Sequence, residues 1–93
     1  MTDLKPRPCF VYVLGSLVSG DQSAMSTYVG WSNNLEARIS KHNKGTGAKF
    51  TRGRQWQLLY VEIFFSRGEA MSREWNLKRD KKFRKALLQN WFD

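Results

Sequence analysis

Three runs of β-branched and aromatic residues restrict the fold of this chain more than any other feature. They are residues 9–14 (CFVYVL), 26–31 (STYVGW) and 56–65 (WQLLYVEIFF), each with the length and composition of a β-strand. Turn-forming residues occupy 16–25, with Gly20-Asp21 as the expected centre of a hairpin. Because a hairpin makes the first two strands antiparallel neighbours, the sequence predicts a small, mainly antiparallel sheet.

A helix is expected directly after the second strand. Residues 32–43 (SNNLEARISKHN) place Asn33 as a helix N-cap, with Glu36 three residues later to complete a capping box. Gly45 marks the end of this helix. Residues 44–55 contain three glycines and no periodicity, so they are predicted to form a mobile basic loop.

Two further helices are expected after the third strand. Ser66 and Glu69 repeat the capping-box spacing, and residues 81–92 form a last amphipathic segment with Phe83, Leu87 and Trp91 on one face. The order β-β-α-β-α-α predicts an α+β fold, a three-stranded sheet flanked by helices. With 93 residues the chain is interpreted as one domain, residues 1–93.

Glu74 stands out in the helix that follows Ser66. At about 100° per residue, its neighbours form an apolar stripe of Ala70, Met71, Trp75 and Leu77, whereas Glu69, Arg73, Asn76 and Asp80 lie opposite. A carboxylate within such a stripe must be paired, hydrogen-bonded, protonated or bound to a metal. Two interpretations stay open: an ion pair with a nearby Arg or Lys, or a ligand for a hard cation such as Mg²⁺.

Charge indicates the kind of partner. Sixteen Lys and Arg against eight acidic residues give a net charge of +8. The basic residues cluster at 41–54 and 78–85 and are interleaved with aromatics, namely Phe50, Trp56 and Phe83. This pattern favours a nucleic acid partner. The lone Cys9 suits a reducing cytoplasm, and no apolar run is long enough to cross a membrane.

Several polar side chains could combine in a catalytic centre. Tyr12 and Tyr28 lie on the two strands of the hairpin, and Gly30 marks a close approach of another group to the second strand. Arg38 and His42 are four residues apart, on one side of the first helix. Together with the carboxylate at position 74, these groups are the components of a single-metal phosphodiesterase centre.

The combination "TYVGWSNNLEARISKHN", "KGTGAKFTRGR" and "SREWNLKR" resembles the GIY-YIG nuclease superfamily. Within it, the chain is similar to the small stand-alone bacterial proteins related to the N-terminal nuclease domain of the excision-repair endonuclease UvrC. The resemblance covers nearly the whole chain, residues 9–85, and implies the same fold. The chain departs from the family pattern at Phe10, where the first motif has glycine, and in a longer hairpin.

The resemblance also implies roles for individual residues. Tyr12 and Tyr28 correspond to the two motif tyrosines, one of which helps to activate the nucleophile, and Gly30 is the motif glycine. Arg38 would stabilise charge on the scissile phosphate. His42 would assist proton transfer or contact the phosphate.

The remaining implied roles concern metal and substrate. Glu74 would ligate a single Mg²⁺ or Mn²⁺, and Lys49 would contact substrate phosphate, with Arg52 and Arg54 of the same basic loop as further candidates. The expected function is a metal-dependent endonuclease that hydrolyses DNA, including branched or damaged DNA in repair. Two alternatives stay open: a non-catalytic nucleic-acid-binding module, and a protein-interaction domain with a protein partner or a second copy of the chain.

Overall fold

The computed structural model describes residues 7–18, 21–51 and 53–92. Its strands are β1 (Cys9–Val18), β2 (Asp21–Ser32) and β3 (Gln57–Phe64). Its helical elements are α1 (Leu35–Asn43), the short 3₁₀ helix η1 (Lys49–Thr51), α2 (Arg67–Arg79) and α3 (Lys81–Phe92). The strand order is β2-β1-β3 and both pairings are antiparallel, which confirms the predicted α+β fold.

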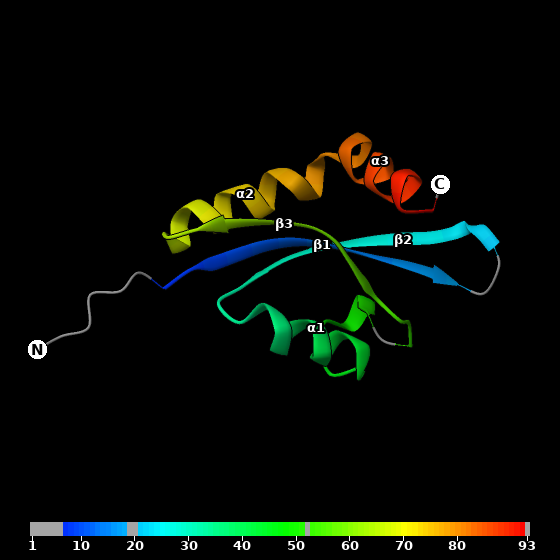
Figure 1. Ribbon diagram of the computed structural model, residues 1–93, viewed down its shortest axis with the longest axis horizontal. Coiled ribbons are helices and arrows are strands. Elements are labelled where there is room, and N and C mark those ends of the chain that lie inside the picture. Colours follow the sequence, from blue (N-terminus) through cyan, green and yellow to red (C-terminus); the bar gives the residue numbers. More distant parts are fainter. Residues whose placement is uncertain (1–6, 19–20, 52, 93) are drawn as a thin grey trace, which may run out of the picture.

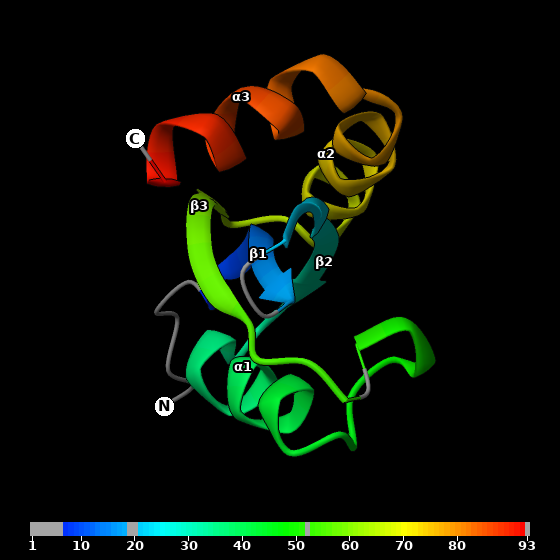
Figure 2. The same ribbon diagram turned by 90° about the vertical axis from the view of Figure 1, so that its right-hand side faces the viewer.

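The sheet separates two layers of helix. Helices α2 and α3 cover one face, while α1 and η1 lie against the other (Figures 1 and 2). The central strand β1 supplies both cores because its side chains alternate. Val11 and Val13 pack toward α2 and α3, and Tyr12 and Leu14 pack toward α1; all four are fully buried.

An irregularity in β3 preserves this alternation. Val13 pairs with Tyr60 and Leu14 pairs with Leu58, so Leu59 is an extra residue opposite β1. Leu59 packs on the α2/α3 side, over Gly15, where an added Cβ would lie 2.6 Å from its Cδ1 atom.

The predicted turn segment is shorter than expected. β1 continues to Val18, β2 begins at Asp21, and these two residues pair. The predicted hairpin centre at Gly20-Asp21 therefore falls partly within β2, and residues 19–20 lie outside the described part of the chain. Strand pairing extended the two strands into residues whose local preference was for turns.

The helix ends follow the predicted chemistry with one correction. The N-cap of α1 is Asn34, whose side chain accepts a hydrogen bond from the Ala37 amide at 3.2 Å, so the assignment of the cap to Asn33 was wrong. Gly45 follows the helix with φ of +80°, as a helix stop requires. Ser66 caps α2 by accepting from the Glu69 amide at 3.3 Å, which confirms that prediction.

Two aromatics expected to face nucleic acid belong to the cores instead. Trp56 is 4% exposed and packs with Tyr12, and Phe83 packs on the α2/α3 side. The Phe50 side chain lies outside the part that the structure describes. The loop after α1 also has more structure than predicted, because η1 interrupts it.

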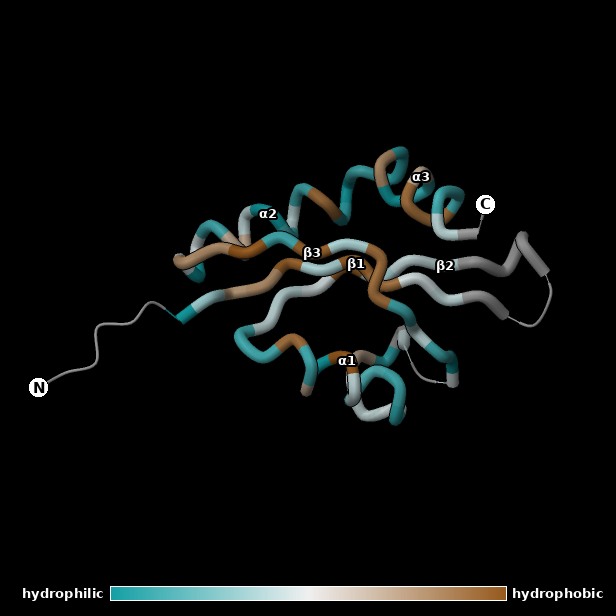
Figure 3. Tube along the Cα trace, in the orientation of Figure 1, coloured by the Kyte–Doolittle hydropathy of each residue, from teal (hydrophilic) through white to brown (hydrophobic). Residues whose placement is uncertain are grey.

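The outer helices bury less than their patterns suggested. α2 is hydrophilic along most of its length (Figure 3), and Met71 and Trp75 are 49% and 58% exposed, so their place in a buried stripe was wrong. In α3, Leu88 is buried while Trp91 is 50% exposed. Across the described ranges, none of the helices has the length and apolar character needed to span a membrane.

Candidate active site

The centre of the site is Tyr12, buried on β1 opposite Gly30 of β2. An added Cβ at Gly30 would lie 2.5 Å from the Tyr12 hydroxyl, so close that an atom must shift. It would also lie 3.1 Å from the Tyr28 ring, which is tighter than ordinary van der Waals contact. Position 30 must therefore lack a side chain for the phenol of Tyr12 to reach across β2. This is the close approach expected of a glycine within a strand.

A buried chain of hydrogen bonds runs from Tyr12 through His42. The Tyr12 hydroxyl lies 2.9 Å from His42 Nε2, and His42 Nδ1 lies 2.9 Å from the Thr51 hydroxyl oxygen. Thr51 donates its own proton to the Ala48 carbonyl at 2.8 Å. Thr51 can therefore only accept from the ring, which places the imidazole proton on Nδ1 and leaves Nε2 to accept from Tyr12.

Burial keeps this chain neutral. Burial, and secondarily the nearby Arg38 charge, lower the pKa of His42. Burial raises the pKa of the Tyr12 hydroxyl to about 12, against a lowering effect of its hydrogen bond to Arg38. At neutral pH both side chains are uncharged. His42 is 0% exposed and both of its ring nitrogens are engaged, so its side chain is not open to direct contact with a ligand.

The loop after α1 is shaped around His42. An added Cβ at Gly47 would lie 2.6 Å from His42 Nδ1, so a larger residue at this position would collide with the imidazole ring. Asn43 fixes the other end of the loop: its side chain accepts from the Trp56 amide at 2.6 Å and donates to the Trp56 carbonyl at 3.2 Å. The Trp56 indole donates to the Thr51 carbonyl at 2.9 Å.

Arg38 connects the two tyrosines. It projects from α1, and hydrogen bonds to Tyr12 and, more weakly, to Tyr28 raise the pKa of its guanidinium. The Tyr28 ring packs against His42 with centroids 4.8 Å apart. Tyr28 and Arg38 are both half-buried, whereas Tyr12 is fully buried. Tyr28 and Arg38 are thus the members of this set that present surface to a substrate.

Glu74 approaches the same place from the opposite layer. Ala70 and Leu77 are fully buried beneath α2, and positions 73 and 74, between them on this face, are half-buried. Arg73 turns to Glu62 of β3, donating to both carboxylate oxygens, so it does not lie on a purely solvated face. The Glu74 side chain is 20% exposed, and its charge contributes to the raised pKa of Tyr12.

The surroundings of Glu74 contain the ion pair that the first interpretation predicts. Its Oε1 lies 3.7 Å from the Lys78 ammonium, one helical turn on, and that lysine is 53% exposed. Ion pairs at this helical spacing contribute only ~0.2–0.5 kcal/mol, and a separation of 3.7 Å is longer than that of a charge-assisted hydrogen bond. The pair is therefore weak enough for a cation to replace Lys78.

The donor set fits Mg²⁺ or Mn²⁺ held mainly by water. Within the described ranges, no group of three or more His, Cys, Asp and Glu side chains could hold a metal ion. Mg²⁺ commonly uses one or two carboxylates and completes its shell with waters and substrate phosphate. Glu74 is a half-buried carboxylate whose charge acts on Tyr12.

Two of the three candidate phosphate contacts of the loop lie within the described residues. Lys49 begins η1 and is exposed. Arg54 is half-buried and donates to the Ser26 hydroxyl at 3.2 Å. Arg52 lies outside the described residues. The roles of these three residues stay predictions.

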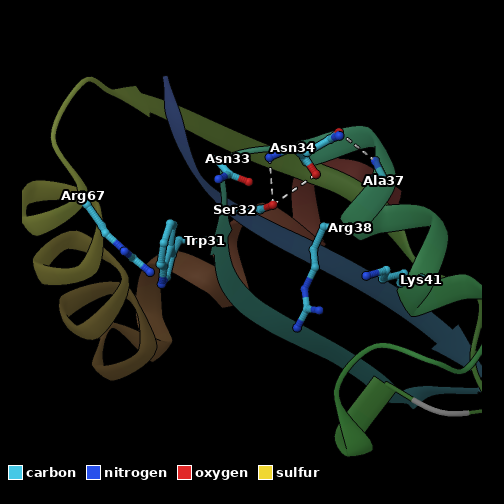
Figure 4. A pocket seen from close by; sticks show the side chains of 8 residues that line it. All are labelled: Trp31, Ser32, Asn33, Asn34, Ala37, Arg38, Lys41 and Arg67. Atoms are coloured by element: carbon cyan, nitrogen blue, oxygen red, sulfur yellow. Dashed lines mark hydrogen bonds between the residues drawn. The ribbon is translucent and has the colours of Figure 1, made fainter. Parts of the chain in front are cut away.

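A hollow of about 470 Å³ adjoins Arg38 (Figure 4). It lies where β2 ends and the two helices α1 and α2 begin, and it is lined by Trp31, Ser32, Asn33, Asn34, Ala37, Arg38, Lys41 and Arg67. Three of these side chains are cationic, and none of the lining residues is acidic. The hollow suits an anionic ligand beside the polar cluster.

A family model described as the GIY-YIG catalytic domain matches residues 8–86, which include every member of this cluster. The chain belongs to that family. The GIY-YIG domain implies an endonuclease-type function that acts on nucleic acid.

Relatives of this GIY-YIG protein carry the name UPF0213. The Clostridium perfringens protein is 54% identical over 55 residues, covering 58% of this chain and 59% of its own length. The Oceanobacillus iheyensis protein is 45% identical over 64 residues, covering 68% and 74%. The Staphylococcus haemolyticus protein is 50% identical over 54 residues, covering 57% and 66%. The match thus spans less than two thirds of the Clostridium protein, and no solved structure matches the chain.

The GIY-YIG signature did not point to several residues that the site uses. Thr51 fixes the tautomer of His42, and Trp56 and Asn43 hold the intervening loop. The sequence predicts a mobile loop at Thr51 and a strand at Trp56, with no role for either residue in the site. The second glycine of "GTGAK" was a usable signal, since a glycine that is not at a turn indicates a close contact.

Proposed function

We propose that this GIY-YIG protein is a divalent-metal-dependent endonuclease that hydrolyses phosphodiester bonds in DNA. The observation that carries the proposal is Arg38, a half-buried guanidinium that interacts with both motif tyrosines, which raise its pKa, at the rim of a cationic hollow. An arginine held in this way is oriented before substrate arrives, so it loses little freedom when it grips a phosphate.

Each residue then has a distinct task. Arg38 stabilises the negative charge that builds on the phosphate oxygens during attack. Tyr28, beside it and half-exposed, orients the attacking water. Tyr12 and His42 are positioning residues, because they hold Arg38 and Tyr28 from beneath and remain uncharged.

Glu74 would hold Mg²⁺ or Mn²⁺ at the edge of β2. Such an ion would supply Lewis-acid chemistry there, activating a water molecule and offsetting negative charge on the leaving oxygen. The net charge of +8 supports a polyanionic substrate, and branched or damaged DNA in repair is the proposed form.

The experiment measures cleavage of nicked, flapped, branched and single-stranded DNA in Mg²⁺ or Mn²⁺. Glu74→Gln should lower the cleavage rate at least ~100-fold while binding in EDTA is retained. Glu69→Gln is the matched control, because this carboxylate lies on the same helix and is exposed. Arg38→Ala should lower the rate more than it weakens binding. Cleavage at full rate by Glu74→Gln would refute the mechanism.

The Glu74–Lys78 ion pair favours a second candidate, a nucleic-acid-binding module without catalysis. In this case the carboxylate serves only to pair with lysine. The module would bind DNA in a salt-sensitive way with no turnover, and Glu74→Gln would leave binding unchanged. Turnover by the wild-type protein, lost in Glu74→Gln and kept in Glu69→Gln, excludes it.

A further inference from the structure

The hollow beside Arg38 contains an aromatic surface that the catalytic proposal does not use. Trp31, on β2, is half-buried against the α2/α3 core, and the Arg67 guanidinium lies 5.3 Å from its ring centroid. In Figure 4, Trp31 and Arg67 lie on one side of the hollow, and Arg38 and Lys41 lie on the other. One wall is therefore aromatic and cationic, and the other is cationic alone.

Between these walls, Ser32 and Asn34 are joined by two hydrogen bonds. Ser32 donates its hydroxyl proton to the Asn34 carbonyl at 3.1 Å and accepts from the Asn34 amide at 2.9 Å. Asn34 also caps α1. Asn33 lies between them in sequence, is exposed, and forms no side-chain hydrogen bond within the described ranges. Its amide offers both a donor and an acceptor to the edge of a ligand.

The volume and the lining residues of the hollow suit one nucleotide. Lys41 and the Arg38 guanidinium suit a phosphate group, Trp31 suits the flat face of a base, and Asn33 suits polar atoms on the base edge. A volume of about 470 Å³ lies in the range of small-molecule sites, whereas phosphate alone would leave Trp31 unused.

We propose that this hollow binds one unpaired nucleotide of the nucleic acid strand that is cut. Its base stacks on Trp31, and the phosphate beside it lies between Arg38 and Lys41. The inference rests on the proposed function, because the strand that enters the hollow is the DNA strand that the nuclease cuts. Since Arg38 also serves the scissile phosphate, the unpaired nucleotide lies next to the cleavage position. The protein therefore favours DNA that is unpaired at this point over a continuous duplex.

The chain provides its own control for this aromatic surface. Trp75 and Arg79 form a second stacked pair, with the guanidinium 4.3 Å from the ring centroid. Trp75 is 58% exposed, and neither residue lines the hollow. A general contribution of exposed tryptophan to DNA binding would involve Trp75 as well as Trp31, whereas a nucleotide site involves only Trp31.

The test uses the full chain in EDTA, so that binding is separated from cleavage. Two fluorescein-labelled DNA hairpins are compared by anisotropy, one fully paired and one with a single unpaired nucleotide in its stem. The wild type should bind the second hairpin about 5- to 150-fold more tightly, the range expected for one base stacked on an aromatic side chain. Trp31→Leu should abolish this preference, Trp31→Phe should largely keep it, and Trp75→Leu should leave it unchanged.

A second measurement uses the wild type alone. With 2-aminopurine as the unpaired nucleotide, stacking on Trp31 should quench the fluorescence of this base when the protein binds the hairpin. In a separate competition, a 5′-mononucleotide at the same concentration as the hairpin should not displace the hairpin. An unchanged 2-aminopurine signal, an equal loss of preference in Trp75→Leu, or displacement by the mononucleotide would overturn the assignment. Binding to both hairpins without preference refutes the nucleotide site alone, whereas binding to neither also refutes the proposed function.

Discussion

Replacing Gly30 by alanine tests whether the site depends on the passage of Tyr12 across β2. The added methyl group would lie 2.5 Å from the Tyr12 hydroxyl and 2.7 Å from the ring carbon that bears it. Ordinary contact begins at 3.4 Å, so the hydroxyl must move by roughly 0.9 Å. Tyr12 is 0% exposed and cannot move outward freely.

This movement affects the rate more than the stability. A shift of roughly 0.9 Å breaks or compresses the 2.9 Å hydrogen bond from Tyr12 to His42 and displaces the oxygen that holds Arg38. A misplacement of about 1 Å can lower a rate by ~10²-fold. Overpacking of a buried position costs about 1–3 kcal/mol of unfolding free energy.

Gly15→Ala provides the matched control. Its added methyl group would also meet a side chain at 2.6 Å, but that side chain is Leu59, on the opposite face of the sheet from the polar cluster. Both variants should lose similar stability in urea unfolding, by about 1–3 kcal/mol. DNA cleavage under single-turnover conditions should fall by ~10²-fold in Gly30→Ala and by less than about 3-fold in Gly15→Ala.

Two results would contradict this reasoning. If Gly30→Ala cleaved DNA at the wild-type rate, the Tyr12 hydroxyl would not determine the position of the reacting groups. If both variants lost activity in proportion to stability, the effect would come from unfolding rather than from the site.

The other predictions concern stability. Because the pKa of Tyr12 is raised from 10.0 to about 12, the folded state holds this proton more tightly than the unfolded chain does. Its contribution is complete below pH 10 and is lost as the pH rises toward about 12, by up to ~2–3 kcal/mol. Urea unfolding at about pH 9 and about pH 11.5 should show this loss in the wild type and not in Tyr12→Phe; an equal loss in both would contradict it. Gly68→Ala should raise the free energy of unfolding by ~0.4–1 kcal/mol, because Gly68 lies in α2 with its nearest contact at 3.7 Å. Gly45→Ala should lower it, because Gly45 has φ of +80°, and thermal unfolding of the two variants should shift in opposite directions.

The fold was largely predictable because each element carries a local signal. Ser66 before α2 and Gly45 after α1 act within one helical turn, so their roles could be read from spacing alone. The errors arose where a distant contact outweighed local preference. Pairing between β1 and β2 extended both strands, to Val18 and from Asp21, into residues that locally prefer turns. No local pattern signals that outcome.

The sequence predicted which residues lie together in the polar cluster, but it did not predict all of the hydrogen bonds between them and their neighbours. The motif placed Tyr12, Arg38 and His42 together, and the structure brings these residues into contact. The motif could not supply the partner of the other imidazole nitrogen, because Thr51 lies nine residues beyond His42 across an irregular loop. Helical periodicity placed Glu74 in a buried stripe, but it could not show that the face runs from Ala70 to Leu77 and leaves Met71 and Trp75 exposed.

The arrangement of Glu74 depends on a residue outside the polar cluster. The tyrosines and Arg38 reach the edge of β2 from the α1 side, and Glu74 reaches it from α2, so the distance between them depends on how α2 is fixed to β2. Arg84 of α3 fixes it, since it donates to the Leu77 carbonyl at 3.1 Å, to the Lys78 carbonyl at 2.7 Å and to the Thr27 hydroxyl at 2.7 Å. Thr27 immediately precedes Tyr28 on β2, so one guanidinium joins the end of the helix that carries the carboxylate to the strand that carries the phenol. The part of the chain that the family model matches, residues 8–86, includes Arg84.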